Sequence, residues 1–201
     1  LTDFIEQGVL DFAQFDFEND DHLKLIHQQR TLSKGDIDQP MIVFANYLFD
    51  SIVTDVFKVN QGQLEETCVS LSTSAANMTD QGPKDWEQVD FDFTQKSMSS
   101  DYYQHDDFDA LLNSYRDLSD DTQLQFPIGS LRGLENLKHL ANGQLLLLSS
   151  DKGYVSREEI DGLEAPEFAI HGSFSLMVNF HALGEYCKSQ QGDCQIPFSI
   201  D

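Results

Sequence analysis

Four short apolar runs, each followed at once by polar residues, most constrain the fold of this 201-residue chain. The runs span residues 9–15, 41–45, 144–148 and 173–178, and the polar residues that follow them are Asp16, Asn46, Ser149 and Asn179. Short apolar runs bounded by turn residues are typical of buried strands in an α/β sheet. The pattern predicts one sheet whose first three strands are parallel. Ligands bind beyond the carboxyl ends of such strands, so the four tips predict one shared site. The alternative is that any strand leaving a core turns polar when it meets water.

Helix signals alternate with these runs, which favours an α/β sheet. We expect helices at 22–27, 106–118 and 181–189, and a helix that Ser130 caps and Gly143 follows. Residues 156–159 (SREE) have the spacing of a capping box, and Asn179 is in position to cap the 181–189 helix. Runs 56–59 and 64–71 predict a hairpin, residues 72–104 an irregular segment, and residues 195–200 a last strand.

The net charge of the chain limits the classes of partner that can bind it. It carries 35 acidic and 12 basic residues, a formal net charge of −23. Phosphates would be repelled, so we expect no nucleic acid and no anionic membrane surface as partner, whereas a basic protein is compatible. The alternative is a surface adapted to salt or cold.

The small number of cysteines and the absence of long apolar runs indicate the cellular compartment of the protein. Cys68, Cys187 and Cys194 form no C-x-x-C pair, which fits reduced thiols in the cytoplasm. No run approaches the ~20 apolar residues that cross a bilayer, and no secretory signal is visible. We therefore predict a cytoplasmic protein.

Common site motifs are absent from the sequence. It has no G-x-G-x-x-G, P-loop, H-E-x-x-H or G-x-S-x-G motif. The histidine spacings are not those of a zinc site, so we expect no metal. Lys152 is a candidate catalytic or anion-binding lysine, and the alternative is that Asp151 and Lys152 only shape a turn.

The strand tips offer better candidates. The Asp16 carboxylate can accept hydrogen bonds from a ribose or an exocyclic amine, and Phe15 and Phe17 can line an adenine pocket. The alternative is a solvated tip beside core aromatics. Asn46 and Asp50 lie one helical turn apart and can hold one polar group if the chain turns helical after residue 45. For this pair the alternative is a helix cap and a solvated acid.

Two of these segments resemble a known family. Residues 45–51 (ANYLFDS), followed by a hairpin, resemble the NELLDA-type segment of class I S-adenosylmethionine-dependent methyltransferases related to the mitochondrial complex I assembly arginine methyltransferase and its bacterial relatives. Residues 174–183 (FSLMVNFHAL) are similar to the DITAHVDFTAL segment of that family, in the same order and at a similar separation. The resemblance implies a Rossmann-like, mostly parallel sheet with helices on both faces. Residues 1–201 would form part of such a domain, with 72–130 inserted between the fourth and fifth strands.

The resemblance also implies a function and a set of site residues. The cofactor would be S-adenosylmethionine, and the methyl acceptor a basic protein or a small molecule. Asn46 and Asp50 would be catalytic, and the cofactor would lie against Asp16, Phe17 and Asn46. The acceptor would contact Tyr47, Phe49, Asn179 and His181.

Two departures from the family pattern qualify these expectations. The glycine-rich first motif and the acidic tip of the second strand are absent and would precede Leu1. We therefore expect an internal part of a longer protein, one that needs its missing N-terminal portion to bind the cofactor well. Tyr47 stands where the relatives usually have Glu, which removes a carboxylate partner for a guanidinium acceptor. The alternative function is a non-catalytic binding or assembly module that has lost the cofactor site.

Overall fold

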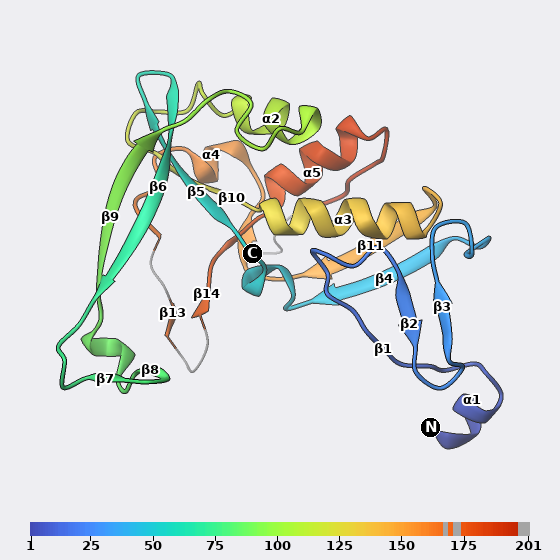
Figure 1. Cartoon of the computed structure of the whole chain (residues 1–201). Helices are drawn as coiled ribbons and strands as arrows, with labels where there is room; N and C mark the ends of the chain where they lie inside the picture. The colour runs from blue at the N-terminus through green and yellow to red at the C-terminus, as the bar shows by residue number, and fades with distance from the viewer. Residues whose placement is uncertain (167–168, 171–173, 197–201) are drawn as a thin grey trace, which may run out of the picture. The chain divides into compact units, whose positions relative to one another are not determined.

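The computed structural model describes residues 1–166, 169–170 and 174–196 (Figure 1). The chain divides into two compact units. Unit 1 comprises Leu1–Ile52 and Ile128–Asp151, and unit 2 comprises Val53–Pro127 and Lys152–Asp201. Each unit is described by itself.

A pair of parallel strands is central to unit 1. β4 (Met41–Asn46) and β11 (Leu145–Ser150) pair in register from Met41 opposite Leu145 to Asn46 opposite Ser150. The predicted parallel pairing of the runs 41–45 and 144–148 is therefore confirmed. Parallel neighbours need a long connection, and here almost a hundred residues separate the two strands along the chain.

Helix α3 (Ile128–Leu140) leads into β11 and buries Leu131, Leu137 and Leu140. Gly143 follows it with a φ of 82° and donates its N–H to Lys138 O at 2.9 Å, as expected for a helix C-terminus. The predicted cap at Ser130 is wrong. The helix begins two residues earlier, and the Ser130 hydroxyl is buried within it without a hydrogen-bond partner.

The N-terminal part of unit 1 is antiparallel. After α1 (Thr2–Glu6), the strands β1 (Ala13–Gln14), β2 (Leu23–Leu25) and β3 (Arg30–Leu32) form a three-stranded sheet in that order. The run 9–15 therefore contributes only a short antiparallel strand, and the helix predicted at 22–27 is a strand. The Asp11 carboxylate holds this arrangement by accepting the N–H groups of His27 and Gln28, both at 2.9 Å.

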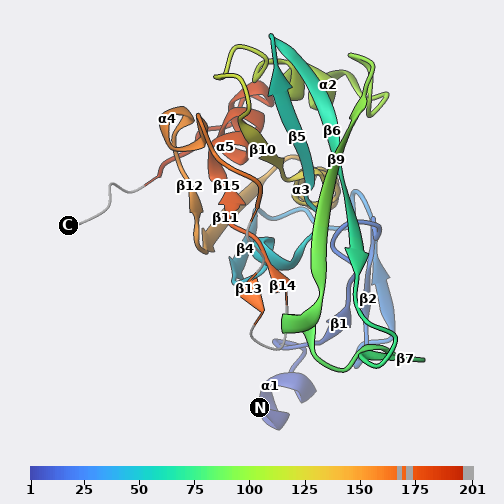
Figure 2. The same cartoon turned by 90° about the vertical axis from the view of Figure 1, so that its left-hand side faces the viewer.

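The largest sheet lies in unit 2 and is antiparallel throughout. Its order is β10 (Gln123–Phe126), β5 (Asp55–Asn60), β6 (Gln63–Ser72) and β9 (Asp90–Ser97). Figure 2 shows β5, β6 and β9 side by side. The Rossmann-like parallel sheet predicted for the whole chain is therefore wrong. A two-residue turn joins β5 to β6, and strands joined by so short a connection pair antiparallel.

The predicted hairpin around residue 61 is confirmed. Gln61 and Gly62 both have positive φ values, 48° and 71°, as a two-residue hairpin turn requires. The segment 72–104 is less irregular than predicted. It contains β7 (Met78–Thr79), β8 (Gly82–Pro83), the 3-10 turn η2 (Trp86–Gln88) and all of β9.

Unit 2 also contains the helices α2 (Asp106–Asn113), α4 (Arg157–Ile160) and α5 (Phe180–Ser189). α2 is shorter than the predicted 106–118, and it packs on α5 through Phe108 and Tyr186, whose ring centroids are 5.6 Å apart. The capping box at Ser156 and Glu159 is confirmed, as is the Asn179 cap on α5. The core is mainly aromatic and aliphatic: Phe57, Val59, Leu64, Leu112, Tyr115, Leu124 and Phe126.

The run 173–178 does not join the β4–β11 sheet. It contributes to β14 (Phe174–Ser175), which pairs with β13 (Ala169–Ile170), and to β15 (Val178–Asn179), which is parallel to β12 (Gly153–Tyr154). Residue 173 and most of the strand predicted at 195–200 lie outside the described residues. Among the helices of the described ranges, none is long and apolar enough to cross a membrane.

Candidate functional site

The carboxyl ends of β4 and β11 form a polar edge in unit 1. Asn46 lies opposite Ser150 at the end of the ladder, and both are exposed. Beyond it, the Tyr47 N–H donates to Ser150 O at 3.1 Å. The Asp50 N–H then donates to the Asp151 carboxylate at 3.2 Å. Two of the four predicted strand tips, a hundred residues apart in sequence, therefore meet at this edge, whereas the runs that end at Asp16 and Asn179 contribute to other sheets.

The backbone after β4 turns sharply. Tyr47 has a φ of 53°, and its side chain is 78% exposed. The short 3-10 helix η1 (Phe49–Ser51) follows, with Leu48 in the capping position. Asn46 is therefore not a helix cap. The helical face that Asn46 and Asp50 were predicted to share is not formed, because the chain turns helical only at Phe49.

The aromatic residues near this edge are core residues. Phe49 is 2% exposed, and its ring lies 5.8 Å from that of Phe17 in an edge-on arrangement. The Phe17 ring occupies the space beside Gly133 in α3, where a Cβ atom would come within 1.9 Å of it. Phe15 contacts Phe17 edge-on at 6.5 Å. The rings of Phe17 and Phe49 therefore pack within unit 1, away from any ligand.

Asp16 closes its own turn. Its Oδ1 accepts the N–H groups of Glu18 at 3.1 Å and Asn19 at 3.2 Å, and both carboxylate oxygens accept from the Asn19 carboxamide at 3.1 Å. The side chain remains exposed. These bonds give the carboxylate a local structural role and occupy acceptor positions that a ribose would need.

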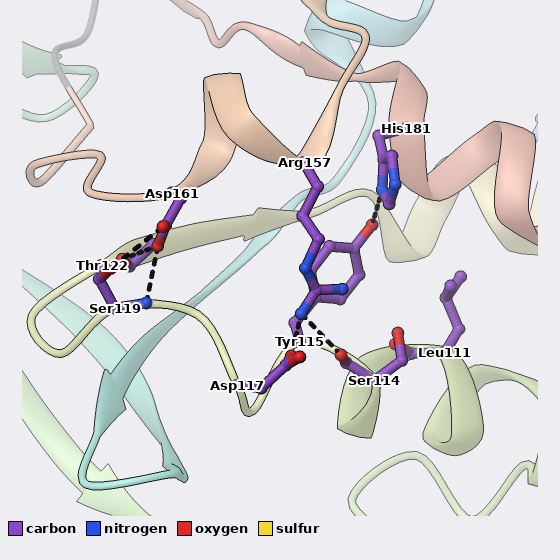
Figure 3. A network of polar contacts seen from close by, with 9 residues as sticks. All are labelled: Leu111, Ser114, Tyr115, Asp117, Ser119, Thr122, Arg157, Asp161 and His181. Atoms are coloured by element: carbon purple, nitrogen blue, oxygen red, sulfur yellow. Dashed lines mark hydrogen bonds and ion pairs between the residues drawn. The ribbon is translucent and has the colours of Figure 1, made fainter.

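Unit 2 contains a polar network around Tyr115 (Figure 3). The Tyr115 hydroxyl and His181 Nδ1 are 2.7 Å apart. The Arg157 guanidinium lies over the Tyr115 ring, with its central carbon 5.4 Å from the centroid. It also donates to Ser114 O at 3.0 Å and forms an ion pair with Asp117. The network joins the segment that follows α2 to α4 and α5.

Burial sets the protonation of the Tyr115–His181 pair. Tyr115 is fully buried, and this burial raises the pKa of its phenol. Partial burial also lowers the pKa of His181 below its ordinary value. Both groups are therefore neutral at pH 7, and with the imidazole proton on Nε2 the hydroxyl donates to Nδ1. A fully buried hydroxyl that is already bonded cannot contact a substrate.

The Asp161 carboxylate, just after α4, binds the loop that contains Ser119 and Thr122. Its carboxylate accepts the Ser119 N–H at 2.6 Å and the Ser119 hydroxyl at 3.0 Å, and these bonds lower its pKa. Thr122 donates its hydroxyl to the same carboxylate at 3.5 Å and accepts the Gly162 N–H at 2.9 Å. Figure 3 shows this cluster beside the Arg157 cluster.

Both polar atoms of the Asn179 carboxamide form hydrogen bonds within unit 2. Its Oδ1 accepts the Ala182 N–H and its Nδ2 donates to Gln125 O, both at 2.9 Å. The residue is 2% exposed. Asn179 and His181 thus belong to unit 2, whereas Asp16, Phe17, Asn46, Tyr47, Phe49 and Asp50 belong to unit 1.

No family model, curated protein or solved structure matches the chain. A function can therefore be inferred only from the geometry of the site residues and from the resemblance of residues 45–51 and 174–183 to methyltransferase segments. Within the described ranges, no group of His, Cys, Asp and Glu side chains is arranged to hold a metal ion.

Tyr115 and Arg157 were not predicted as a polar cluster with His181. Tyr115 reads as a core residue on the apolar face of the 106–118 segment, and Arg157 as part of a capping box. The separations of 66 residues from Tyr115 to His181 and of 40 from Arg157 to Asp117 leave no local signal. Lys152 follows β11 in a turn and accepts the Val178 N–H with its carbonyl at 2.8 Å.

Proposed function

We propose that the chain forms part of an S-adenosylmethionine-dependent methyltransferase, with its reacting groups at the carboxyl edge of β4–β11. The observation that carries the proposal is the in-register parallel pairing, which brings Asn46 to Ser150 and Asp50 to Asp151. Ligands of open α/β sheets bind at the carboxyl ends of parallel strands. The resemblance of residues 45–51 to a methyltransferase segment supports the same edge.

The residues at the edge fit this chemistry in part. Asn46 presents an exposed carboxamide, which has both a donor and an acceptor for a cofactor or an acceptor group. Asp50 adds a half-buried carboxyl-bearing residue on the adjoining turn. Phe17 and Phe49 do not fit a ligand pocket, because their rings fill the core of unit 1.

Orientation is the main contribution that these residues can make. When bound, S-adenosylmethionine supplies an electrophilic methyl group. Asn46 would hold the cofactor by a hydrogen bond from its carboxamide and so orient the methyl group toward the acceptor, and Asp50 would accept the proton that the acceptor loses. Holding two reactants in line replaces a bimolecular encounter with an effectively unimolecular step.

A cationic acceptor fits the charge of the chain. The net charge of −23 attracts basic proteins over distances of about a Debye length. Tyr47 presents an exposed aromatic ring at the edge. Such a ring can contact a cation through its face without a carboxylate partner.

Asn46→Ala tests the proposal, with Gln14→Ala as a matched control. Gln14 also exposes a carboxamide in unit 1, on β1. We expect Asn46→Ala to weaken binding of S-adenosylmethionine by about 1–3 kcal/mol, the cost of losing a hydrogen-bonding partner. Both variants should keep their melting temperatures, because exposed substitutions change stability by about 0.5 kcal/mol or less. Equal affinities for the two variants would contradict the proposal.

A non-catalytic binding or assembly module is the second candidate function. Its supporting observation is that the polar groups of Tyr115, Asn179 and His181 are engaged within unit 2. This candidate predicts no effect of S-adenosylmethionine, so the same titration separates it from the first.

A further inference from the structure

One face of the β4–β11 pair is apolar and exposed. Side chains alternate between the two faces of a strand. Ala45 is buried and Met41 and Val43 are half-buried, while α3 lies along β4 and β11 in Figure 1. The opposite face carries four exposed side chains, which we name the outer apolar face: Ile42 (58% exposed), Phe44 (74%), Leu146 (51%) and Leu148 (43%).

The four side chains are contiguous. Ile42 lies opposite Leu146, and Phe44 lies opposite Leu148, in the parallel register. Residues opposite each other across a ladder point to the same side of the sheet. The outer apolar face is therefore one patch rather than four scattered residues, and contiguous patches of this kind mark interaction sites.

The edges of the pair are also open to pairing. In the part of the chain that the structure describes, β4 and β11 form a sheet of two strands only. Parallel strands are almost always covered on both faces, and sheets of two strands are marginally stable. Neither strand contains a charged residue or a proline, in a chain that is 23% charged. Charges and prolines are the usual means of preventing an exposed edge from pairing, and here they are missing.

We propose that β4–β11 docks an extended segment of a second, basic polypeptide. The segment adds as a further strand at an open edge and covers the outer apolar face with its partner side chains. Strand addition obtains its affinity from main-chain hydrogen bonds and its specificity from alternate side chains. The occupant is thus an apolar strand with Lys or Arg at both ends.

Size argues for a strand rather than a second copy of this chain. A large apolar side chain has roughly 150–200 Å² of surface. Because the four side chains of the outer apolar face are only partly exposed, together they present on the order of 400 Å² of accessible apolar surface. A stable interface between folded proteins buries about 800 Å² on each partner. A single strand needs less surface, because the edge supplies hydrogen bonds as well.

Charge specifies the ends of the segment. Asp36 and Asp38 precede β4, while Asp50 and Asp151 follow β4 and β11. Lys34 and Lys138 also lie near the amino end, beside Asn142 and Gly143. The carboxylates of Asp50 and Asp151 and the net charge of −23 are therefore what repels a second copy and attracts a segment flanked by basic residues.

A labelled synthetic peptide tests the docking. The probe is fluorescein-Lys-Lys-Val-Thr-Val-Ile-Val-Thr-Lys-Lys, and its fluorescence anisotropy is measured against the protein. Phe44→Lys removes the most exposed apolar side chain of the face. Phe4→Lys is the matched control, because Phe4 is a 55% exposed phenylalanine on α1 of the same unit and the charge change is identical. Circular dichroism verifies that both variants are folded.

We expect Phe44→Lys to weaken binding about tenfold or more, and Phe4→Lys to change it less than about twofold. A probe that is N-methylated at alternate residues should lose binding, because it cannot form the main-chain hydrogen bonds. Equal weakening by the two variants, binding that survives N-methylation, or no binding of the probe would overturn the proposal. So would a dimer in light scattering that Phe44→Lys abolishes, because the occupant would then be a second copy. None of these outcomes depends on S-adenosylmethionine.

Discussion

A Gly133→Ala substitution tests how Phe17 is held in unit 1. A Cβ atom at position 133 would lie 1.9, 2.1 and 2.5 Å from three carbons of the Phe17 ring, whereas ordinary contact begins at 3.4 Å. The ring would have to retreat by more than an ångström from its position against α3. Phe17 is buried and also packs edge-on against Phe49, so a small rotation cannot relieve the clash.

Two opposing effects set the size of the change. Overpacking of a core costs about 1–3 kcal/mol, and complete loss of the ring's packing would cost about 3–5 kcal/mol. Replacing glycine by alanine in a helix returns about 1 kcal/mol. We therefore expect a net destabilisation of unit 1 by about 1–3 kcal/mol.

Urea unfolding followed by circular dichroism measures this change, and hydrogen exchange in α3 assigns it to unit 1. Arg132→Ala, an exposed substitution in the same helix, is the control and should change stability by about 0.5 kcal/mol or less. A Gly133→Ala protein that is about 1 kcal/mol more stable than the native one would refute the packing of Phe17 against α3. Phe17 would then be available to a ligand, as the sequence suggested.

Two further predictions concern unit 2. The lowered pKa of His181 means that the unfolded chain binds its proton more tightly, near pH 6.5, so stability should fall as the pH drops through and below about 6.5. Thermal unfolding followed by Trp86 fluorescence at about pH 7.5 and about pH 5 should show this loss of stability. A His181→Phe variant should lose less stability between the two pH values, and an equal loss would exclude His181 as the cause. Asn179→Ala should cost about 1–3 kcal/mol, because it removes the α5 cap and the bond to Gln125 O. In urea unfolding, Asn60→Ala, an exposed carboxamide in the same unit, should change stability by about 0.5 kcal/mol or less, and an equal effect of the two would contradict the prediction.

Features that depend on neighbours in the sequence were predictable. The turn at Gln61 and Gly62 needs two positive φ values, and the sequence signals it directly. The Asn179 cap and the Ser156 capping box act over three residues. The β4–β11 pairing was also predictable, because both strands are continuous apolar runs with a helix signal before the second.

Features that depend on distant partners were not predictable. Residues 23–25 form a strand because they pair with β1 and β3, and Asp11 binds the backbone at His27, sixteen residues away. β9 pairs with β6 although its alternating DFDFT sequence lies in a polar segment without a sustained period. The assignment of the run 9–15 to the parallel sheet failed for a similar reason, since a buried strand and a short edge strand share the same apolar pattern.

The most direct test of the central claim is a set of amide NMR spectra of the ¹⁵N-labelled protein, recorded with increasing S-adenosylmethionine up to millimolar concentrations. The proposal predicts that the resonances of Asn46, Tyr47, Ser150 and Asp151 shift together, because these residues meet at the carboxyl edge of β4–β11. It also predicts that Asn46→Ala reduces these shifts. Shifts confined to unit 2, or shifts at the edge that Asn46→Ala leaves unchanged, would contradict the claim that methyl transfer takes place at this edge.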